Sequence, residues 1–501
     1  MKVKIPKDYL IIILSAVVSA FAYMQMYIFV LLFSWSLLFY ILLKNQSDKK
    51  AIKYGFVFGL FYGVTLFMWI FDSLKEYSSK AYLGIFVIIA LAFIYGLQYA
   101  LFSYLFNRLN TLLSKTNLYL RILSLACLLT LLDEFFSFLY TGIPFLNLRV
   151  GFTLSYNLYL VQFAKIGGVA ILSFMVFLIN ALISNFILTK KRFDLIVVFA
   201  CIITIFLFGF ILYSPILKKQ KLFKVSVVSA NINPKISWDA ENGNQLAQNY
   251  FSVCESASNQ NPVFIVFPES AIPWLYTEKD DFVSELLKIN KNNKTTLVIG
   301  ANKIVSKSEL ANSVLFISKN EGNYASYSKN VMLEAFEKPL LNFFQLPFYA
   351  NADLKYSKTG TPEPILTKYG NAGVLICNES TEENFVKEQV QNHANYFFVL
   401  SNDGWFKDTY ISLYHFYISR IMAVAHNKDF AKSSNCGFNG IIKSNGAILD
   451  VKKSSEPVSI TNFIASNSTA TFYSSNPYLF LTFILLTIIL SKLTTFKFKL
   501  S

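Results

Sequence analysis

The chain has 501 residues, which is enough for two or three domains. Hydrophobic residues make up 54% of it and charged residues 15%, whereas roughly a quarter of the residues of soluble domains are charged. The formal charge of +15 arises mostly from basic residues between apolar runs, a pattern typical of membrane topology that argues against nucleic-acid binding. The composition therefore predicts a membrane protein with a sizeable extramembrane part.

Eight apolar runs occur along the chain, and most of them reach the roughly 18 residues that a helix needs to cross a bilayer. They lie near residues 8–23, 24–43, 54–71, 83–106, 118–140, 158–188, 194–214 and 477–492. Lysine and arginine are concentrated in the short segments that face the cytoplasm if the N-terminus is inside. We therefore predict a helical membrane bundle of about eight transmembrane helices. Its divisions are a bundle of about seven helices over 1–214, an extramembrane domain over 215–470, and a last helix with a cytoplasmic tail over 471–501.

Two acids, Asp133 and Glu134, lie inside the fifth apolar run, where ionised groups are costly. They are compatible with a lipid-facing cavity, with anchoring of a helix end, or with pairing of two helices near the membrane surface. The segment that follows, Tyr140–Phe145, holds a glycine and a proline, which is typical of a turn or a re-entrant element.

Short β-rich stretches alternate with helical ones in the extramembrane part, which favours a layered α/β domain. Several of the predicted strands are apolar enough to be buried on both faces. The strands are expected over 224–228, 263–267, 296–299, 314–318, 374–377 and 397–401, and the helices near 241–257, 280–290 and 411–427. Asn445-Gly446 predicts the turn of a hairpin.

Glu269, Lys329 and Cys377 each follow a strand-like stretch, so a sheet can present them together at one rim. A thiol reacts as thiolate, and its ordinary pKa of ~8.5 leaves it mostly protonated at neutral pH. Glu269 is a candidate base for the thiol proton, and Lys329 is a candidate partner for the thiolate and for an oxyanion. The pattern predicts acyl transfer through a cysteine. Packing roles for each residue, and a Cys–His site that uses His393 or His415, stay open.

No CxxC pair is present, and the three histidines lack metal-ligand spacing, so we expect neither a metal site nor a cofactor. A disulfide framework is also not expected from the five cysteines, which are Cys127, Cys201, Cys254, Cys377 and Cys436.

Several segments resemble the apolipoprotein N-acyltransferases, membrane members of the nitrilase superfamily. The run from Phe267 to Pro273 is similar to the family's W-P-E-[ST]-A-[IL]-P, Cys377-Asn378-Glu379 to its C-Y-E, and Ser401–Phe406 to its S-N-D-[AG]-W-F. His415, Arg420 and Ala423 resemble the family's H-x4-R-x2-A, and Gly142–Phe145 its G-[FI]-P-W. The resemblance implies a nitrilase-like α-β-β-α sandwich and a Glu-Lys-Cys triad.

The resemblance also implies roles and partners. Glu269 would be the base, Lys329 the oxyanion stabiliser and Cys377 the nucleophile. The acyl donor would be a phospholipid, the intermediate a Cys377 thioester, and the acceptor the α-amine of diacylglyceryl-cysteine in a lipoprotein. The enzyme would be a monomer in the bacterial inner membrane, with its catalytic domain on the periplasmic face. Supporting or substrate-binding roles would belong to Glu337, Glu379, Trp238, Asn231, Trp405 and Phe406.

The chain departs from the family pattern at four places, one of which is the strand segment Val228–Asn231, where the family usually has V-Q-G-N. Asn378 replaces a tyrosine, Phe267 a tryptophan, and the segment Asn330–Phe336 does not match the family's H-L-V-P-F-G. The apolar segment Pro339–Ala350 is a candidate arm for lipid chains, or an ordinary core segment. Two other functions remain as alternatives: a membrane-anchored carbon–nitrogen (amide) hydrolase, and a non-enzymatic membrane receptor with a degenerate nitrilase-like domain.

Overall fold

The computed structural model describes residues 6–77, 82–214, 221–334, 336–339, 355–357, 361–406 and 408–500. Its contacts divide the chain into two compact units. Unit 1 contains Met1–Leu139, Leu146–Tyr213 and Ser475–Ser501, and unit 2 contains Tyr140–Phe145 and Ser214–Ser474. A short loop between two helices of unit 1 therefore belongs to unit 2, a feature that the sequence does not reveal.

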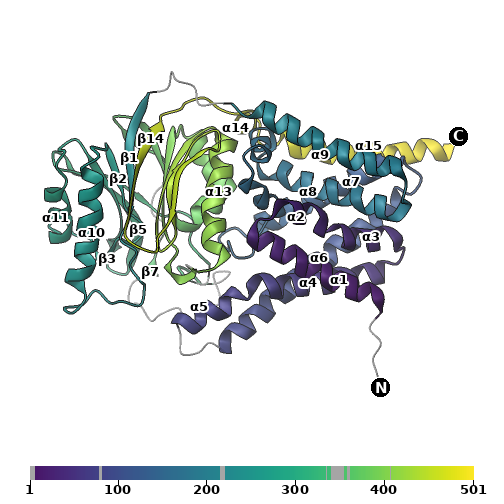
Figure 1. The fold of residues 1–501 in the computed structure, drawn as a ribbon, viewed down its shortest axis with the longest axis horizontal. Helices are drawn as coiled ribbons and strands as arrows, with labels where there is room; N and C mark the ends of the chain where they lie inside the picture. Colours follow the sequence, from purple (N-terminus) through teal and green to yellow (C-terminus); the bar gives the residue numbers. More distant parts are fainter. Residues whose placement is uncertain are drawn as a thin grey trace. The chain divides into compact units, whose positions relative to one another are not determined.

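Unit 1 is helical throughout its described residues (Figure 1). Its α-helices are α1 (Lys7–Gln25), α2 (Ile28–Ser34), α3 (Ser36–Lys44), α4 (Asp48–Phe67), α5 (Trp69–Tyr77), α6 (Tyr82–Leu112), α7 (Leu118–Leu139), α8 (Ala164–Thr189), α9 (Arg192–Leu212) and α15 (Leu479–Leu500). Two 3-10 helices, η1 (Val150–Tyr156) and η2 (Leu160–Phe163), precede α8.

The membrane character of unit 1 agrees with the prediction. Among the described residues, 6 helical segments are long and apolar enough to cross a bilayer, and the shorter segments Ile28–Lys44 and Leu479–Thr494 are also apolar. These segments coincide with the eight predicted runs. The number that crosses the membrane stays a prediction, because two of them are short.

Glycines allow α4 and α6 to approach each other closely. A Cβ atom on Gly55 would overlap the carbonyl oxygen of Tyr99, and one on Gly59 would overlap that of Tyr95. Gly63 continues the same stripe against Ala92. The spacing of four residues places all three on one face of α4, as in the small-residue contacts of membrane helices.

Asp133 and Glu134 join neighbouring elements of unit 1. Arg149, which is buried, lies 3.6 Å from Asp133 through its Nε atom and forms an ion pair with Glu134. Ser173 of α8 donates a hydrogen bond to Asp133 Oδ2 at 2.7 Å. These contacts correspond to the expected helix-pairing role, because they satisfy buried charges that would otherwise be costly in an apolar bundle.

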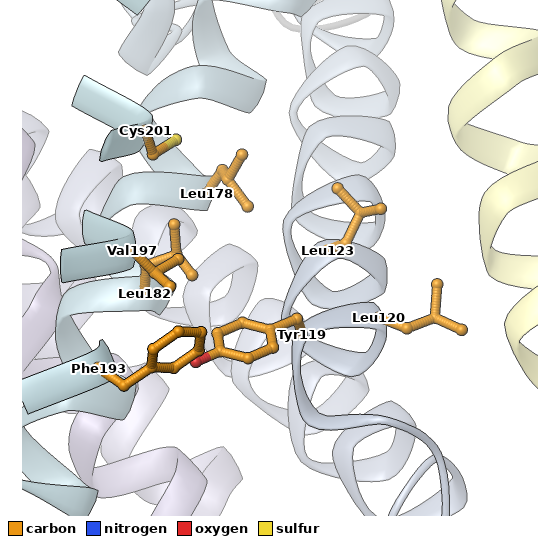
Figure 2. A pocket seen from close by; sticks show the side chains of 8 residues that line it. All are labelled: Tyr119, Leu120, Leu123, Leu178, Leu182, Phe193, Val197 and Cys201. Atoms are coloured by element: carbon orange, nitrogen blue, oxygen red, sulfur yellow. The ribbon is translucent and has the colours of Figure 1, made fainter. Parts of the chain in front are cut away.

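An apolar hollow of about 550 Å³ lies between α7, α8 and α9 (Figure 2). Most of its lining side chains are aliphatic or aromatic: Tyr119, Leu120, Leu123, Leu178, Leu182, Phe193, Val197 and Cys201. The Tyr119 hydroxyl donates to Asp194 Oδ1 at 2.6 Å, so the polar group in this lining already has a partner.

Unit 2 is built on two sheets. The first has the strand order β14-β1-β2-β4-β5-β6, with β3 beside β4 and β7 beside β5. Its strands are β1 (Leu222–Ser229), β2 (Phe264–Val266), β3 (Ile272–Leu275), β4 (Thr296–Ser306), β5 (Glu309–Ser318), β6 (Gly322–Ser328), β7 (Lys355–Tyr356) and β14 (Val458–Ala465).

The second sheet has the order β13-β12-β11-β10-β9-β8. Its strands are β8 (Ile365–Thr367), β9 (Gly370–Ile376), β10 (Tyr396–Asn402), β11 (Asp429–Asn435), β12 (Phe438–Ile442) and β13 (Ile448–Lys453). The hairpin between β12 and β13 turns at Gly446, whose φ is +82°, as the Asn-Gly pair predicts.

Helices cover the outer faces of the two sheets, which gives the predicted α-β-β-α sandwich (Figure 1). Helices α10 (Gly243–Ser258) and α11 (Asp281–Ile289) lie on the side of the first sheet. Helices α12 (Glu383–Gln391) and α13 (Tyr410–His426) lie on the side of the second. Short helices η3 (Cys377–Thr381), η4 (Gly404–Phe406) and α14 (Phe472–Ser475) complete the unit. Strands β1 and β11 face each other across the two sheets.

The covering helices are amphipathic, which explains their positions. In α10 the buried residues Leu246, Tyr250, Val253 and Ala257 recur at helical spacing and pack on the first sheet. Helix α11 begins at Asp280, whose side chain accepts a hydrogen bond from the N–H of Val283. The nine strands and helices predicted in this part are all present, with ends that differ by a few residues.

Candidate active site

The two candidate residues of the first sheet follow strands that run in the same direction. Glu269 comes shortly after β2, and Lys329 follows β6 directly. Strand β4 is parallel to β2 and is separated from β6 by two antiparallel pairings, so β2 and β6 point the same way. As a result Lys329 Nζ lies 3.8 Å from Glu269 Oε1.

Cys377 comes from the second sheet, directly after β9, and is the first residue of η3. Its φ of +53° lies in the left-handed region, which is strained for a residue with a side chain. The side chain is half-buried, and it lies close enough to Glu269 to lower the pKa of that acid. The three side chains that the sequence singles out therefore converge between the two sheets.

Glu269 is held by donors from both sheets. Asn312 Nδ2 of β5 donates to Oε1 at 2.8 Å, and the backbone N–H of Asn402 donates to Oε2 at 3.0 Å. The ion pair with Lys329 and the Cys377 thiol complete its surroundings. Each carboxylate oxygen thus has a protein partner, which fixes the orientation of the group.

Lys329 lies between two carboxylates. Its Nζ atom donates to Glu337 Oε1 at 2.8 Å, and the backbone N–H of Leu333 donates to Glu337 Oε2 at 2.7 Å. Asn312 Nδ2 is also 3.4 Å from Glu337 Oε1, so the same amide contacts both acids. A buried lysine needs such partners because an unpaired charge is expensive in a protein interior.

The electrostatics of the site favour a neutral thiol beside a charged amine. Burial raises the pKa of Cys377 well above its ordinary value, Glu269 raises it further, and Lys329 opposes both. Burial also raises the pKa of Glu269 despite the Lys329 charge. Burial alone would lower the pKa of Lys329, but Glu337 and Glu269 outweigh it and the pKa rises. Glu269 is therefore a stronger base than an ordinary carboxylate, and Lys329 stays cationic.

Glu379 supports the turn that carries the thiol. Its carboxylate accepts hydrogen bonds from the Tyr327 hydroxyl and from the backbone N–H groups of Asn330, Val331 and Ile376, at 2.6–3.0 Å. Burial raises its pKa to about 7 in spite of these donors. The side chain joins the segment after Lys329 to the end of β9. The backbone segments that carry the ammonium and the thiol are therefore held next to each other.

The competing Cys–His arrangement does not match the geometry. His415 Nε2 lies 2.9 Å from the backbone carbonyl oxygen of Cys377, and Nδ1 lies 2.9 Å from Asp403 Oδ1. Both ring nitrogens are therefore committed to oxygen atoms, and neither is directed to the thiol. His393 is exposed in the turn between α12 and β10.

The remaining predicted site residues lie in different surroundings. Asn231 follows β1 with a left-handed φ of +53°. The Trp238 ring packs against Tyr250, Trp274 and Phe282, at the edge of the core beneath α10 and α11. Trp405 is exposed in η4.

Phe406 belongs to a small aromatic group. Its ring centroid is 6.4 Å from that of Phe145, which is also 6.4 Å from that of Phe336. Phe336 is next to Glu337, so the group adjoins the segment that holds Lys329. Of the candidate lipid arm, 340–350 lies outside the described residues.

Sequence reasoning missed two residues that the structure places in this region. Asn312 contacts Glu269 and Glu337, and Glu382 accepts a hydrogen bond from the Gly142 N–H at 3.0 Å. No local pattern marks either of them, because their partners are remote in sequence. The Gly142–Phe145 motif points to the loop but not to the acid that binds it.

Comparisons with known proteins agree with this architecture. Residues 15–182 match the family model of the apolipoprotein N-acyltransferase N-terminal domain, and residues 224–448 match that of the carbon–nitrogen hydrolases. A carbon–nitrogen hydrolase structure from Helicobacter pylori covers 53% of this chain and 95% of its own, at 14% identity and a TM-score of 0.37. The two family-model matches give a membrane protein with a carbon–nitrogen hydrolase domain.

Curated relatives match the chain across both units. An apolipoprotein N-acyltransferase from Vibrio parahaemolyticus is 25% identical over 82% of this chain and 82% of its own. One from Rickettsia prowazekii is 26% identical over 88% of this chain and 89% of its own. The chain is therefore similar to apolipoprotein N-acyltransferases over most of its length.

Proposed function

We propose that this protein transfers a fatty acyl chain from a phospholipid, through a thioester on Cys377, to the α-amine of diacylglyceryl-cysteine in apolipoproteins. Residues 215–470 form the catalytic domain in this proposal, and the helices before and after it hold that domain at the periplasmic face of the inner membrane. The membrane helices and the names of the relatives support this assignment.

In the first half-reaction the Cys377 sulfur attacks the ester carbonyl carbon of the phospholipid. Glu269 takes the thiol proton as the S–C bond forms, and Lys329 stabilises the negative charge that develops on the carbonyl oxygen. The C–O bond then breaks, and Glu269 returns the proton to the departing oxygen. The products are an acyl-thioester on Cys377 and a lysophospholipid.

In the second half-reaction the α-amine attacks the thioester carbonyl. Glu269 takes a proton from the amine as the N–C bond forms, and the same proton goes to the Cys377 sulfur when the C–S bond breaks. The result is an amide on the lipoprotein and a free thiol, so the site returns to its starting state. Such two-step transfer gives ping-pong kinetics.

One observation carries the proposal: the Lys329 ammonium lies between Glu269 and Glu337, at the point where the thiol meets Glu269. An ammonium that two acids hold in place is pre-oriented for an oxyanion that forms beside the sulfur. The raised pKa of Glu269 suits a group that accepts and returns one proton in each half-reaction.

The test is intact-mass analysis of the purified full-length protein after incubation with phospholipid alone. We expect an acyl adduct that maps to Cys377, an equal amount of lysophospholipid, and release of the adduct on addition of a diacylglyceryl peptide. Cys377→Ala abolishes the adduct, whereas Cys254→Ala, which alters a buried cysteine away from the rim, retains it. Acyl transfer by Cys377→Ala at the wild-type rate would overturn the proposal.

The same experiment separates transfer from hydrolysis. A carbon–nitrogen hydrolase would release free acid or ammonia from a small amide and would form no lysophospholipid. Transfer requires that the amine reaches the thioester in preference to water, so the ratio of amide product to free fatty acid measures it directly.

A further inference from the structure

His415 is held between a carboxylate and the backbone of the proposed nucleophile. Its Nδ1 atom is 2.9 Å from Asp403 Oδ1, and its Nε2 atom is 2.9 Å from the Cys377 carbonyl oxygen. Ser380 Oγ lies 3.0 Å from Nε2 and 2.9 Å from the same carbonyl oxygen. His415 and Asp403 are both buried, so water does not substitute for these contacts.

The positions of these oxygens determine how many protons the ring carries. A carbonyl oxygen has no proton to donate, so the short contact at Nε2 requires an N–H there. If the Ser380 hydroxyl donated to Nε2 instead, the lone pair on Nε2 would still face the Cys377 oxygen at 2.9 Å. Nδ1 faces Asp403 in the same way and also requires an N–H, unless that acid is protonated.

Asp403 is ionised in this setting. Burial would raise its pKa, but His415, Lys432 and hydrogen bonds to the carboxylate together outweigh burial, and the pKa falls below its ordinary value. Ser412 Oγ also donates to Asp403 Oδ2 at 3.3 Å. With an ionised acid on one side and a carbonyl on the other, both ring nitrogens of His415 are donors, and the ring is an imidazolium.

We propose that His415 is a positively charged positioning residue that holds the Cys377 backbone carbonyl and cancels the charge of Asp403 behind the thiol. The inference rests on the proposed role of Cys377 as nucleophile. In this role His415 does not contact the reacting atoms. It acts by holding the strained left-handed turn at Cys377 and through the electrostatic field of its positive charge at the thiol.

The charge matters because Asp403 opposes ionisation of the thiol. Asp403 contributes to the rise in the pKa of Cys377, together with burial and Glu269. The buried Lys432 of β11 is a further cation in this region, besides Lys329: its Nζ donates to the His415 carbonyl oxygen at 2.8 Å, and burial lowers its pKa to about 8. Without the imidazolium, Asp403 would lose the cation that contacts its carboxylate directly.

The test uses the full-length protein in detergent, with iodoacetamide as a probe of the thiolate across a pH series. Alkylation at Cys377 is followed by peptide mass, so the result does not depend on acyl transfer. We expect His415→Gln to raise the apparent pKa of the thiol by about one unit, which lowers alkylation at neutral pH about tenfold. The double variant Asp403→Asn/His415→Gln removes the uncompensated acid and returns the profile toward that of the wild type.

A purely structural role predicts a different result, in which the double variant is at least as impaired as the single one. That outcome, or a wild-type profile for His415→Gln, would overturn the proposal. If His415→Gln does not fold, spectra of the wild-type protein with ¹⁵N-labelled histidine decide the question. The three histidines of the chain include the buried His426, which serves as a neutral reference because burial lowers its pKa to about 4. A His415 ring with one unprotonated nitrogen refutes the assignment.

Discussion

The backbone N–H of Gly142 donates to Oε1 of Glu382 at 3.0 Å, across 240 residues of sequence. The Gly142 carbonyl oxygen in turn accepts from the Glu334 N–H, also at 3.0 Å. The Gly142 loop, which follows α7 in sequence, is therefore bound through both its N–H and its C=O to the rest of unit 2. Because Glu337 follows Glu334 closely and holds Lys329, this loop supports the position of the proposed oxyanion stabiliser.

Replacement of Glu382 with alanine leaves the buried Gly142 N–H without its acceptor. An unsatisfied buried donor costs about 1–3 kcal/mol, so we expect a lower melting temperature in detergent and slower acyl transfer. Glu382→Gln keeps an acceptor oxygen and is the milder variant. Glu388→Ala removes an exposed acid from α12, the helix that Glu382 immediately precedes, and serves as the control. Equal effects of the two alanine variants would contradict this role.

Glu382 also predicts a pH dependence of stability. Burial raises its pKa to about 7, above its ordinary value, and the Gly142 N–H opposes the rise. The folded state therefore binds this proton more tightly than the unfolded state, and the contribution to stability is lost as the pH rises through about 7. Glutamine mimics the protonated acid. We expect the melting temperature of Glu382→Gln minus that of the wild type to increase as the pH passes through this range. A difference that does not vary with pH would refute the assignment.

Gly142→Ala tests the conformation of the loop. Gly142 has a φ of +79°, and an added Cβ would lie 3.1 Å from the Met332 carbonyl oxygen. Gly322→Ala is a matched control, since its φ of +62° carries the same backbone penalty of about 1–2 kcal/mol while its Cβ would meet no atom within 4 Å. We expect Gly142→Ala to lower the melting temperature and the acylation rate more than Gly322→Ala does. Identical losses would mean that the close contact does not matter.

Asn312→Asp tests the amide that contacts both acids of the site. A third carboxylate would replace the donor to Glu269 and Glu337, and hydrogen bonds to charged groups contribute about 1.5–3 kcal/mol. We expect the rate of acyl-thioester formation to fall about ten- to hundredfold, because each ~1.4 kcal/mol is a factor of ten. Asn323→Asp adds the same charge at an exposed position of the neighbouring strand and should leave the rate unchanged. A wild-type rate for Asn312→Asp would remove Asn312 from the site.

Gly59→Ala tests the contact between α4 and α6. The added methyl group would overlap the Tyr95 carbonyl oxygen, a backbone atom that moves only if the helices separate. Overpacking of this kind typically costs about 1–3 kcal/mol, so the melting temperature in detergent should fall. Gly84→Ala is the control, because its Cβ would meet no atom nearer than Leu74 Cδ1 at 3.2 Å and Phe71 Cα at 3.3 Å, whereas that of Gly59 would overlap a carbonyl oxygen. A larger loss for Gly84→Ala would contradict the close approach of the two helices.

Local sequence patterns located six strands and three helices of unit 2 but missed several other strands. Strand β10 was predictable because Tyr396–Leu400 is an apolar run that is buried on both faces. Strand β11 is equally buried, yet it contains Lys432, Ser433 and Ser434. Its polar groups find partners that come from elsewhere in the chain, such as the carbonyl oxygens of His415 and Val228. A pattern based on hydrophobicity cannot recognise a strand whose buried polar atoms are satisfied by remote segments.

The order and type of the residues determined by themselves that the chain has apolar helices before and after a layered α/β domain, and that Glu269, Lys329 and Cys377 follow strand-like stretches. Those features depend on residues that lie only a few positions apart, so they can be recognised directly in the sequence. Only the tertiary structure decided that Asn312 contacts both Glu269 and Glu337, that Glu382 binds the Gly142 loop, and that His415 faces a carbonyl rather than the thiol. Such contacts join positions tens to hundreds of residues apart, and packing alone brings them within hydrogen-bonding distance.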